Sequence, residues 1–586
     1  MSGLGVSRHV TAGRHKLVNI RQKTLLVAKW RALWVLAMFG AIAASAIVRI
    51  GFLGLFQSDV HRFSMADALT PDRGEIVDRR GQVLAREFKA YALSFNPKAL
   101  DEGPPLVGNG RDVAAALARI FPDESAASFE KKLSSGDWGY LRRRILPEDA
   151  NRVIALGEPA LEFPREPDRY YPQGSLAAHV LGYVDSDKKG QVGMEQVFDE
   201  QLTDPIARAE PAMLSIDARV QGALEDELGR GMRLSDAKGA AAVILDVDTG
   251  EVLALASMPT FDPNRLKKYD MSGPIGKTGE RGPPNGFNRV TNSVYELGSV
   301  FKPISVAAAI DAGTITHLGQ SYQASRPLIV GGHPIRDSHT IASTLNVPQA
   351  LIHSSNIVTA QIADELGGKR LKATMETLGM NDRPAIELPA RGFPIWPEGD
   401  WSRVKTMTVS FGHGLAVTPL HLASAYAALV NGGVWRPATL RKLASEDVPA
   451  GRRVFKASTS ARMRQILRMI VVYGTGKNAD APGFRVGGKT GSAEKPGKGG
   501  YRRSSLVSTF AAAFPMDHPR YVVVAMLDEP KGTAATSGQR TASWNAAPVV
   551  GRVIPRIGPL LGVMPDETRD IDISDLRPLI AREIAR

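Results

Sequence analysis

The chain has 586 residues, a formal net charge of +13 and no cysteine. This length exceeds the ~100 to 200 residues of one domain, so it predicts more than one hydrophobic core. A content of 43% hydrophobic and 23% charged residues excludes a wholly disordered chain, and the lack of cysteine excludes disulfides, zinc–thiolate sites and a thiolate nucleophile.

The N-terminal 31 residues carry most of the charge asymmetry. They hold seven Lys or Arg side chains and no acidic one, so the rest of the chain is only mildly basic and we expect no nucleic-acid partner.

Residues 32–56 are apolar apart from Arg49, and as a helix rising about 1.5 Å per residue they exceed a hydrocarbon core of about 30 Å. Positive charge before the span predicts a cytoplasmic tail (1–31), a transmembrane helix (32–56) and an outward-facing remainder, which is single-pass type II topology. A cleaved signal peptide is the alternative, because the run ASA at 44–46 is similar to a cleavage site.

Two folded parts are expected beyond the membrane. Residues 57–225 are interrupted by Pro and Gly, with short β-like runs and a helical stretch at 111–120, which predicts an irregular α+β domain. Residues 226–575 begin with the hairpin runs AAVILDV and EVLALAS and end with the strand runs SLVSTFAAAF and YVVVAMLD. Helical patterns lie between these strands, at 299–312, 347–366 and 418–430. This order predicts an α+β fold with a mixed, mainly antiparallel sheet whose first and last strands are adjacent, and residues 576–586 are expected to form a C-terminal tail.

Three short patterns in the larger part carry chemistry: SVFK at 299–302, SSN at 354–356 and KTG at 489–491. Together they resemble the signature of the penicillin-recognising serine acyltransferases. Each pattern is weak alone, because further SxxK, SxN and KTG runs occur at 186–189, 94–96, 543–545 and 277–279. Only the runs at 299–302, 354–356 and 489–491 have the order and spacing expected of one active site.

The residue types in these patterns suit nucleophilic catalysis. A serine hydroxyl needs a base within hydrogen-bond reach, and a spacing of three on a helix brings Lys302 to the face of Ser299. Lys302 must be uncharged, so its pKa has to fall by about three units, which burial and a second cation, Lys489, can achieve. We expect Ser354 to relay a proton to the leaving amine, and Asn356 to hold Lys302 or a substrate amide.

The strand that carries the KTG run is expected to bind the donor substrate. Lys489 and Thr490 offer an ammonium and a hydroxyl to a terminal carboxylate, and Gly491 lets the substrate backbone approach. The backbone N–H groups of Ser299 and Ser492 are expected to form the oxyanion hole. Pro303 restricts the helix to a start near Ser299 or to a tight first turn.

We expect no metal or cofactor. Four histidines lack metal-ligand spacing and are interpreted as packing or hydrogen-bonding residues: His179, His353, His413 and His421.

Nearly the whole chain resembles the class B penicillin-binding proteins, which are monofunctional peptidoglycan transpeptidases. Besides the three motifs, the runs RGEIVDRRG at 73–81, RYYP at 169–172 and GME at 193–195 resemble boxes of the family's N-terminal domain. The run SFGHG at 410–414 resembles a family segment beside the active-site cleft. The resemblance implies an elongated pedestal domain of the dimerisation type (57–225) and a β-lactamase-like transpeptidase domain (226–575). The boxes are structural in the family, and we interpret four of their residues in that way: Arg73, Asp78, Arg79 and Glu195.

The resemblance also implies the reaction and its surroundings. The donor is a peptidoglycan stem peptide ending in D-Ala-D-Ala, Ser299 is acylated, and an amine of a neighbouring stem resolves the acyl-enzyme. β-Lactams should be trapped, because no ExxLN-like acid follows Asn356 to activate a deacylating water. A lipid-linked precursor, a membrane glycan polymerase and other divisome membrane proteins are the expected partners. The chain is most similar to the septal type, in the bacterial inner membrane with its catalytic domain in the periplasm.

Four alternatives remain open on sequence. The same chemistry could serve cell elongation, or the fold could be a catalytically silent penicillin-binding sensor. The run GFRVGGKT at 483–490 fits the GxxxxGK[ST] phosphate loop, which predicts an NTPase only if a helix follows. A bifunctional synthase would need a glycosyltransferase domain where the three N-terminal boxes lie.

Overall fold

The computed structural model describes residues 7–56, 72–99, 106–135, 137–185, 187–273, 283–338, 341–497 and 500–585. The chain divides into two units, residues 1–70 and 71–586, which we describe separately. The expected start of the pedestal at 57, Ser186 and the KTG-like run at 277–279 lie outside the described residues.

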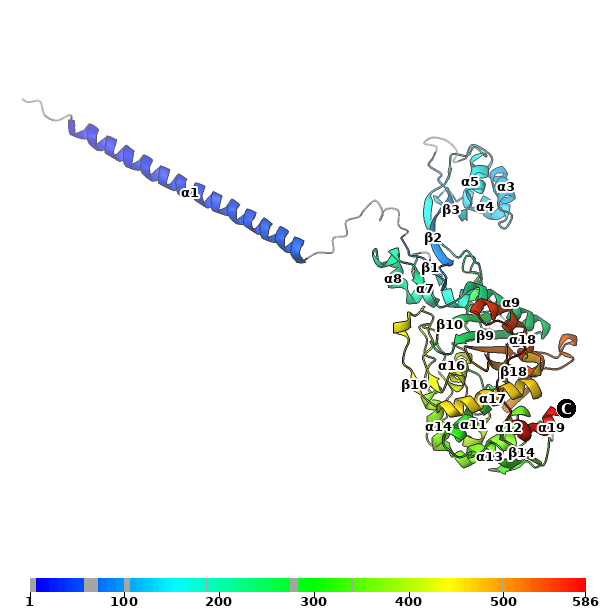
Figure 1. Ribbon diagram of the computed structural model, residues 1–586. Coiled ribbons are helices and arrows are strands. Elements are labelled where there is room, and N and C mark those ends of the chain that lie inside the picture. Colours follow the sequence, from blue (N-terminus) through cyan, green and yellow to red (C-terminus); the bar gives the residue numbers. More distant parts are fainter. Residues whose placement is uncertain are drawn as a thin grey trace, which may run out of the picture. The chain divides into compact units, whose positions relative to one another are not determined.

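The first unit contains one long helix, α1 (Ser7–Phe56) (Figure 1). Its stretch Leu25–Arg49 has a mean hydropathy of 1.9 and is not buried by any other part of the described chain. This stretch overlaps the predicted span at 32–56, and its length and composition suit a helix that crosses a membrane.

The second unit begins with an elongated α+β region built on the long strand β2 (Val83–Phe95). This strand pairs antiparallel with β3 (Gly139–Ile145), β4 (Leu161–Glu162) and β5 (Arg165–Tyr170). Three helices pack at its far end, as Figure 1 shows: α3 (Gly110–Ile120), α4 (Ala126–Leu133) and α5 (Pro147–Ile154). The predicted helix at 111–120 is therefore confirmed.

The base of this region is held by a buried ion-pair triad. Glu195 accepts hydrogen bonds from Arg73 Nε (2.8 Å) and Arg169 Nε (2.7 Å), and all three side chains are at most 1% exposed. Arg169 also donates to the carbonyl of Gly74 (2.6 Å). Residues from all three N-terminal boxes thus converge on one carboxylate, which supports their structural interpretation.

Asp78 and Arg79 connect the base to the catalytic region. Asp78 accepts from the backbone N–H of Ala218 (3.0 Å), at the start of α9 (Ala218–Leu234). Arg79 lies 3.5 Å from Glu251. The expected boundary at 225/226 falls inside α9, which packs against the catalytic sheet.

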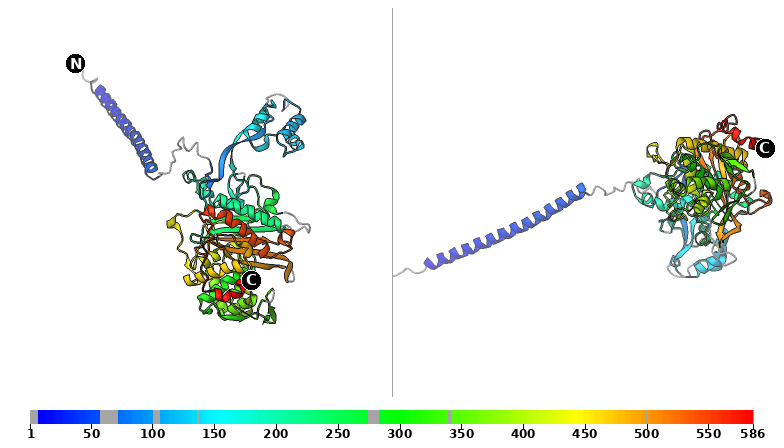
Figure 2. Two further views of the ribbon diagram at one scale, coloured as in Figure 1. Left: turned by 45° about the vertical axis from the view of Figure 1, so that its right-hand side comes forward. Right: turned by 90° about the horizontal axis from the view of Figure 1, so that it is seen from below.

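The catalytic region is built on a five-stranded sheet (Figures 1 and 2). Its order is β10 (Val252–Met258), β9 (Gly239–Asp246), β19 (Tyr521–Asp528), β18 (Gly500–Phe514) and β17 (Gly487–Gly497). The N-terminal strand β9 lies beside the C-terminal strand β19, as predicted. All four pairings are antiparallel; among the described strands a parallel pair occurs in the pedestal, between β1 (Ile76–Val77) and β8 (Ala212–Met213).

Both faces of this sheet are covered. Ala241, Val243 and Leu245 of β9 belong to a core shared with α11 (Lys302–Asp311), α16 (Pro419–Val430) and α17 (Ala457–Tyr473). The alternate residues Ala240, Ala242 and Ile244 belong to a second core with α9 and α18 (Ala546–Ile557). Burial on both faces explains why these strands are continuously hydrophobic rather than alternating.

Two predicted features are wrong in detail. The expected helix at 347–366 is two helices, α12 (Val347–Ile352) and α13 (Asn356–Leu366), separated at Ser354, whose φ is 60°. The expected C-terminal tail is folded onto the catalytic region, where Asn346 donates to the carbonyl of Leu579 (2.7 Å) and Glu583 accepts from His353 (2.9 Å).

The remaining elements are short. The helices and 3-10 turns are α6 (Ala178–Leu181), α7 (Gly193–Val197), α8 (Asp199–Thr203), η1 (Ala207–Ala209), α10 (Lys268–Ser272), η2 (Gly298–Phe301), α14 (Gly368–Thr377), α15 (Arg403–Ser410), η3 (Ser445–Asp447), η4 (Lys477–Ala479), η5 (Ala534–Thr536), η6 (Ala542–Trp544), η7 (Pro559–Leu561), η8 (Arg577–Ile580) and α19 (Ala581–Ile584). The strands are β6 (Tyr183–Val184), β7 (Gly190–Val192), β11 (Ser321–Gln323), β12 (Leu328–Val330), β13 (His333–Ile335), β14 (Thr344–Asn346), β15 (Val434–Trp435) and β16 (Arg452–Arg453).

Candidate active site

Ser299 lies in a tight turn at the start of α11. The turn is the 3-10 segment η2, and α11 begins at Lys302 with Pro303 in its first turn, where a missing N–H is tolerated. Tyr426, on the buried helix α16, donates to the carbonyl of Val300 (2.8 Å) and so holds the turn in place. Within the described part of the chain the Ser299 hydroxyl has no hydrogen-bond partner, and the amine of Lys302 is hydrogen-bonded to Ser354 instead.

The amine of Lys302 is fully buried one helical turn beyond Ser299. It donates to both oxygens of Ser354: to the carbonyl, and to the hydroxyl at 3.1 Å. The left-handed conformation of Ser354 ends α12 and allows both oxygens to meet the same amine, which a continuous helix would prevent. The break in the predicted helix is therefore part of the site.

A second buried lysine contacts the same hydroxyl. Lys489 Nζ donates to Ser354 Oγ (2.9 Å) and to the carbonyl of Thr490 (3.0 Å). Burial lowers the pKa of Lys302 well below its usual range, the charge of Lys489 lowers it further, and the carboxylate of Asp337 acts in the opposite direction. Burial lowers the pKa of Lys489 to about 7. These shifts favour Lys302 as the uncharged amine of the pair, which is the state that a general base requires.

This pair leads to a prediction about pH. Replacing Lys489 with Gln should move the acid limb of β-lactam acylation to higher pH, because removing a positive charge raises the pKa of Lys302 and leaves less uncharged amine at a given pH. The saturating acylation rate, measured between about pH 5 and 9, reports this limb. Lys489→Arg keeps the charge and should leave the limb near its wild-type position. An unchanged limb in the Gln variant would contradict electrostatic coupling of the two lysines.

The KTG run lies on β17 beside the nucleophile turn. Thr490 Oγ1 lies 2.7 Å from Thr475 Oγ1, which adds a second hydroxyl that the sequence did not reveal. A Cβ on Gly491 would lie 2.4 Å from the carbonyl oxygen of Leu297, so the glycine lets the turn pack against the strand. This contact is one physical reason for a glycine here, and the approach of the substrate backbone stays a prediction.

Ser492 follows on the same strand. Its hydroxyl accepts from the N–H of Ala542 (3.0 Å), and its carbonyl oxygen lies 3.0 Å from the position of a Cβ on Gly298. The backbones of Ser492 and of the nucleophile turn are therefore neighbours, as an oxyanion hole between them would need.

Asn356 makes no hydrogen bond to the lysine pair within the described residues. Its amide donates to the carbonyl of Arg336 (2.9 Å), and its backbone N–H donates to Asp337 (2.5 Å). Asp337 also accepts from the hydroxyl of Ser355 (2.7 Å) and so fixes the start of α13. No motif around Asp337 marked it in the sequence, since its role depends on a loop that folds back onto the SSN run.

A further cluster lies against the nucleophile turn. Glu296 accepts hydrogen bonds from Tyr501 (3.1 Å) and from the N–H of Gly414 (3.0 Å), and its second oxygen lies 3.9 Å from His413 Nδ1. Sequence reasoning assigned none of these side chains to the site. The SFGHG run at 410–414 was the available signal for this cluster in the sequence, because the family segment that it resembles lies beside the active-site cleft.

The phosphate-loop alternative is excluded. Its last residues continue into strand β17, whereas a phosphate loop must open a helix.

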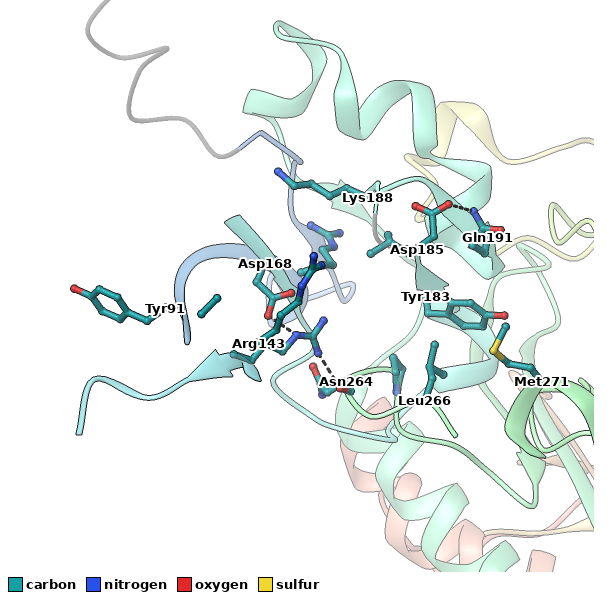
Figure 3. Close-up of a pocket in the computed structure, with 15 residues that line it drawn as sticks. Tyr91, Arg143, Asp168, Tyr183, Asp185, Lys188, Gln191, Asn264, Leu266 and Met271 are labelled. Carbon is teal, nitrogen blue, oxygen red and sulfur yellow. Dashed lines mark hydrogen bonds and ion pairs between the residues drawn. The ribbon is translucent and has the colours of Figure 1, made fainter. Parts of the chain in front are cut away.

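A cavity of about 480 Å³ lies elsewhere, between the pedestal and residues 263–271 (Figure 3). Its charges are largely paired: Arg144 contacts Asp168 and donates to the carbonyl of Asn264 (2.8 Å), and Lys188 lies 3.0 Å from Glu87. None of the predicted site residues lines this cavity. The candidate chemistry therefore belongs to the lysine pair and not to this cavity.

Comparisons with known proteins match the two folded parts of the chain. Residues 240–551 match the family model described as penicillin binding protein transpeptidase domain, and residues 68–204 match the penicillin-binding protein dimerisation domain. The chain is 38% identical to the probable peptidoglycan D,D-transpeptidase FtsI of Caulobacter vibrioides, over 91% of this chain and 89% of that relative. It is 30% identical to the peptidoglycan D,D-transpeptidase FtsI of Escherichia coli, over 80% and 79%. The crystal structure of penicillin binding protein 3 from Mycobacterium tuberculosis complexed with ampicillin superposes with a TM-score of 0.64 at 25% identity, over 86% of this chain and 98% of that one.

Proposed function

The chain belongs to the class B penicillin-binding proteins of the FtsI type, and we propose that it cross-links peptidoglycan stem peptides as a serine D,D-transpeptidase with Ser299 as its nucleophile. One observation carries the assignment of the nucleophile: an uncommitted serine hydroxyl lies one helical turn from a buried lysine whose pKa is strongly lowered. A reactive hydroxyl beside an uncharged amine is the arrangement that acyl transfer needs.

In acylation, Lys302 takes the proton of Ser299, and Ser299 Oγ attacks the carbonyl of the penultimate D-Ala. The backbone N–H groups of Ser299 and Ser492 stabilise the oxyanion. Ser354, hydrogen-bonded to both lysines, returns the proton to the leaving amine of the terminal D-Ala.

Lys489 and Thr490 bind the carboxylate of the donor. The pKa of Lys489 near 7 in the empty site rises when a carboxylate binds, so the ammonium is stabilised by the substrate itself. Asn356 contributes its amide to the substrate, since the lysine pair is already held by Ser354.

The proposal includes a place in the cell. The protein is anchored in the bacterial inner membrane by residues 32–56, with the tail 1–31 in the cytoplasm, and acts at the division septum. The pedestal (57–225) and the transpeptidase domain (226–575, with 576–586 folded onto it) lie in the periplasm. A membrane glycan polymerase, other divisome proteins and lipid-linked precursor are its partners. The apolar stretch in α1 and the FtsI relatives support this placement.

Mass spectrometry tests the proposal. The full chain in detergent, treated with a penicillin, is expected to carry one stable adduct on the peptide that contains Ser299. Ser299→Ala should carry none. An adduct on another residue, or a labelled Ala variant, would refute the assignment.

Penicillin labelling alone does not distinguish an enzyme from a catalytically silent sensor, so a stem-peptide donor must also be added. Release of D-Ala from a stem-peptide donor supports the enzyme, and penicillin binding without any turnover supports the sensor. Depletion in cells distinguishes septal synthesis from elongation, because loss of septal synthesis gives filaments and loss of elongation gives rounded cells.

A further inference from the structure

Three segments that are distant in the chain meet at the carboxylate of Glu296. Glu296 precedes the nucleophile turn, His413 lies in the loop after α15, and Tyr501 lies at the start of β18. Tyr501 and the N–H of Gly414 both donate to Oε1 of Glu296. The carboxylate is therefore held by two hydrogen bonds on one of its oxygens.

The other oxygen is unsatisfied. Oε2 of Glu296 is buried and has no hydrogen-bond partner within the described part of the chain, and His413 Nδ1 lies 3.9 Å from it. The Glu296 side chain is only 13% exposed, whereas that of His413 is 33% exposed. A buried carboxylate oxygen without a donor is costly, so an unpartnered one at a functional site needs an explanation.

His413 is held in place beside this oxygen by ring contacts. Its ring centre lies 5.5 Å from that of Phe411 and 5.6 Å from that of Tyr501. One ring nitrogen faces the carboxylate, and the exposed part of the imidazole remains open to a ligand. A carboxylate behind an imidazole orients the ring and stabilises its protonated form.

The cluster lies directly on the nucleophile turn. A Cβ on Gly412 would lie 2.2 Å from the carbonyl oxygen of Gly298, and the N–H of Gly298 donates to the carbonyl of Gly412 (3.3 Å). The loop that carries His413 is therefore packed against the turn that carries Ser299.

The surroundings of His413 favour its uncharged form. Burial lowers the pKa of His413, the carboxylates of Glu296 and Glu494 act in the opposite direction, and protonation of Lys302 would lower it further. Burial and the carboxylate of Glu296 raise the pKa of Tyr501 to about 12, so this phenol stays protonated and keeps donating. An imidazole in this environment is uncharged at neutral pH and can accept a proton.

We propose that Glu296 and His413 form the site that binds and deprotonates the acceptor amine. The inference rests on the proposed transpeptidase function. An alkyl amine with a pKa of about 10.4 arrives as an ammonium at neutral pH and cannot attack until it loses a proton. The carboxylate of Glu296 attracts such a cation.

The step balances as follows. His413 takes one proton from the acceptor ammonium and becomes imidazolium, stabilised by Glu296. The neutral amine forms a C–N bond to the acyl carbon on Ser299, and the C–O bond to Ser299 breaks. The second proton of the amine passes to Ser299 Oγ through Lys302 and Ser354, an amide is released, and His413 returns its proton to solvent.

The test compares two acceptors on the full chain in detergent. A thioester donor ending in a D-Ala mimic acylates the enzyme, and the product ratio of aminolysis to hydrolysis is measured with D-alanine, which is an ammonium at neutral pH, or with hydroxylamine, which is mostly uncharged. His413→Gln and Glu296→Gln should each lower the ratio with D-alanine by at least about 10-fold. With hydroxylamine the ratio should change by less than about twofold, because no proton has to be removed first.

Controls separate this inference from the proposed function. Fluorescent penicillin should label Ser299 normally in both variants, and His317→Gln, an exposed histidine away from the cluster, should behave as wild type. Glu296→Gln keeps an acceptor for Tyr501 and Gly414, so it tests the charge if His413→Gln folds poorly. An equal loss with both acceptors, or no loss with D-alanine, would overturn the inference. Loss of penicillin labelling in the wild type would instead overturn the proposed function.

Discussion

Replacing Lys302 with Met is expected to reduce acylation of Ser299 by β-lactams by at least about 10³-fold, because the serine loses its only general base within one helical turn. Lys302→Arg should be equally inactive, since a guanidinium is always positively charged and cannot act as a base. The second-order rate constant for penicillin acylation measures the effect. Lys369→Met, which replaces an exposed lysine of α14, is the control.

Lys302→Met should leave the fold intact and raise the free energy of unfolding at neutral pH. Lys302 has a lower pKa in the folded state than in the unfolded one, so the unfolded chain binds more protons and the stability of the wild type falls as pH drops below the unfolded pKa of about 10.4. Methionine removes this penalty. Acylation within about tenfold of the wild type, or loss of folding in the Met variant, would contradict the role of a neutral buried base.

Replacing Glu195 with Ala is expected to destabilise the protein by about 3 to 5 kcal/mol, because the change leaves Arg73 and Arg169 buried without their shared partner. Both guanidinium groups are at most 1% exposed and cannot reach water without opening the base of the pedestal. Denaturant or thermal unfolding of the full chain measures the loss. Glu200→Gln, on the exposed side of α8, should change stability by less than about 0.5 kcal/mol.

This prediction also separates structure from catalysis. At a temperature where the Glu195→Ala protein is still folded, its Ser299 should react with penicillin at nearly the wild-type rate, because the triad makes no contact with the lysine pair. A stable variant that fails to react would contradict the structural interpretation of the boxes.

The sequence alone was sufficient for the main elements and motifs. The hydrophobic runs of β9 and β19, the apolar stretch in α1 and the helix at 111–120 are local patterns, and such patterns depend on neighbouring residues rather than on tertiary contacts. The spacing between Ser299 and Lys302 is local as well, and the structure kept both in one turn with Pro303 tolerated at the start of α11.

Only the tertiary structure decided how these patterns combine. The break at Ser354 costs helical hydrogen bonds that local propensity favours, and it is retained because two buried lysines need the same hydroxyl. Gly491 is required by the carbonyl of Leu297, nearly two hundred positions earlier in the chain.

The sequence thus determined which groups are the candidates for the chemistry, because motif order and spacing are properties of the chain itself. The fold decided which partners they meet, including the contacts of Glu296 with His413 and Tyr501. Such contacts join segments whose separation in sequence says nothing about their distance, so burial and charge at the site arise only when the sheet and its helices are assembled.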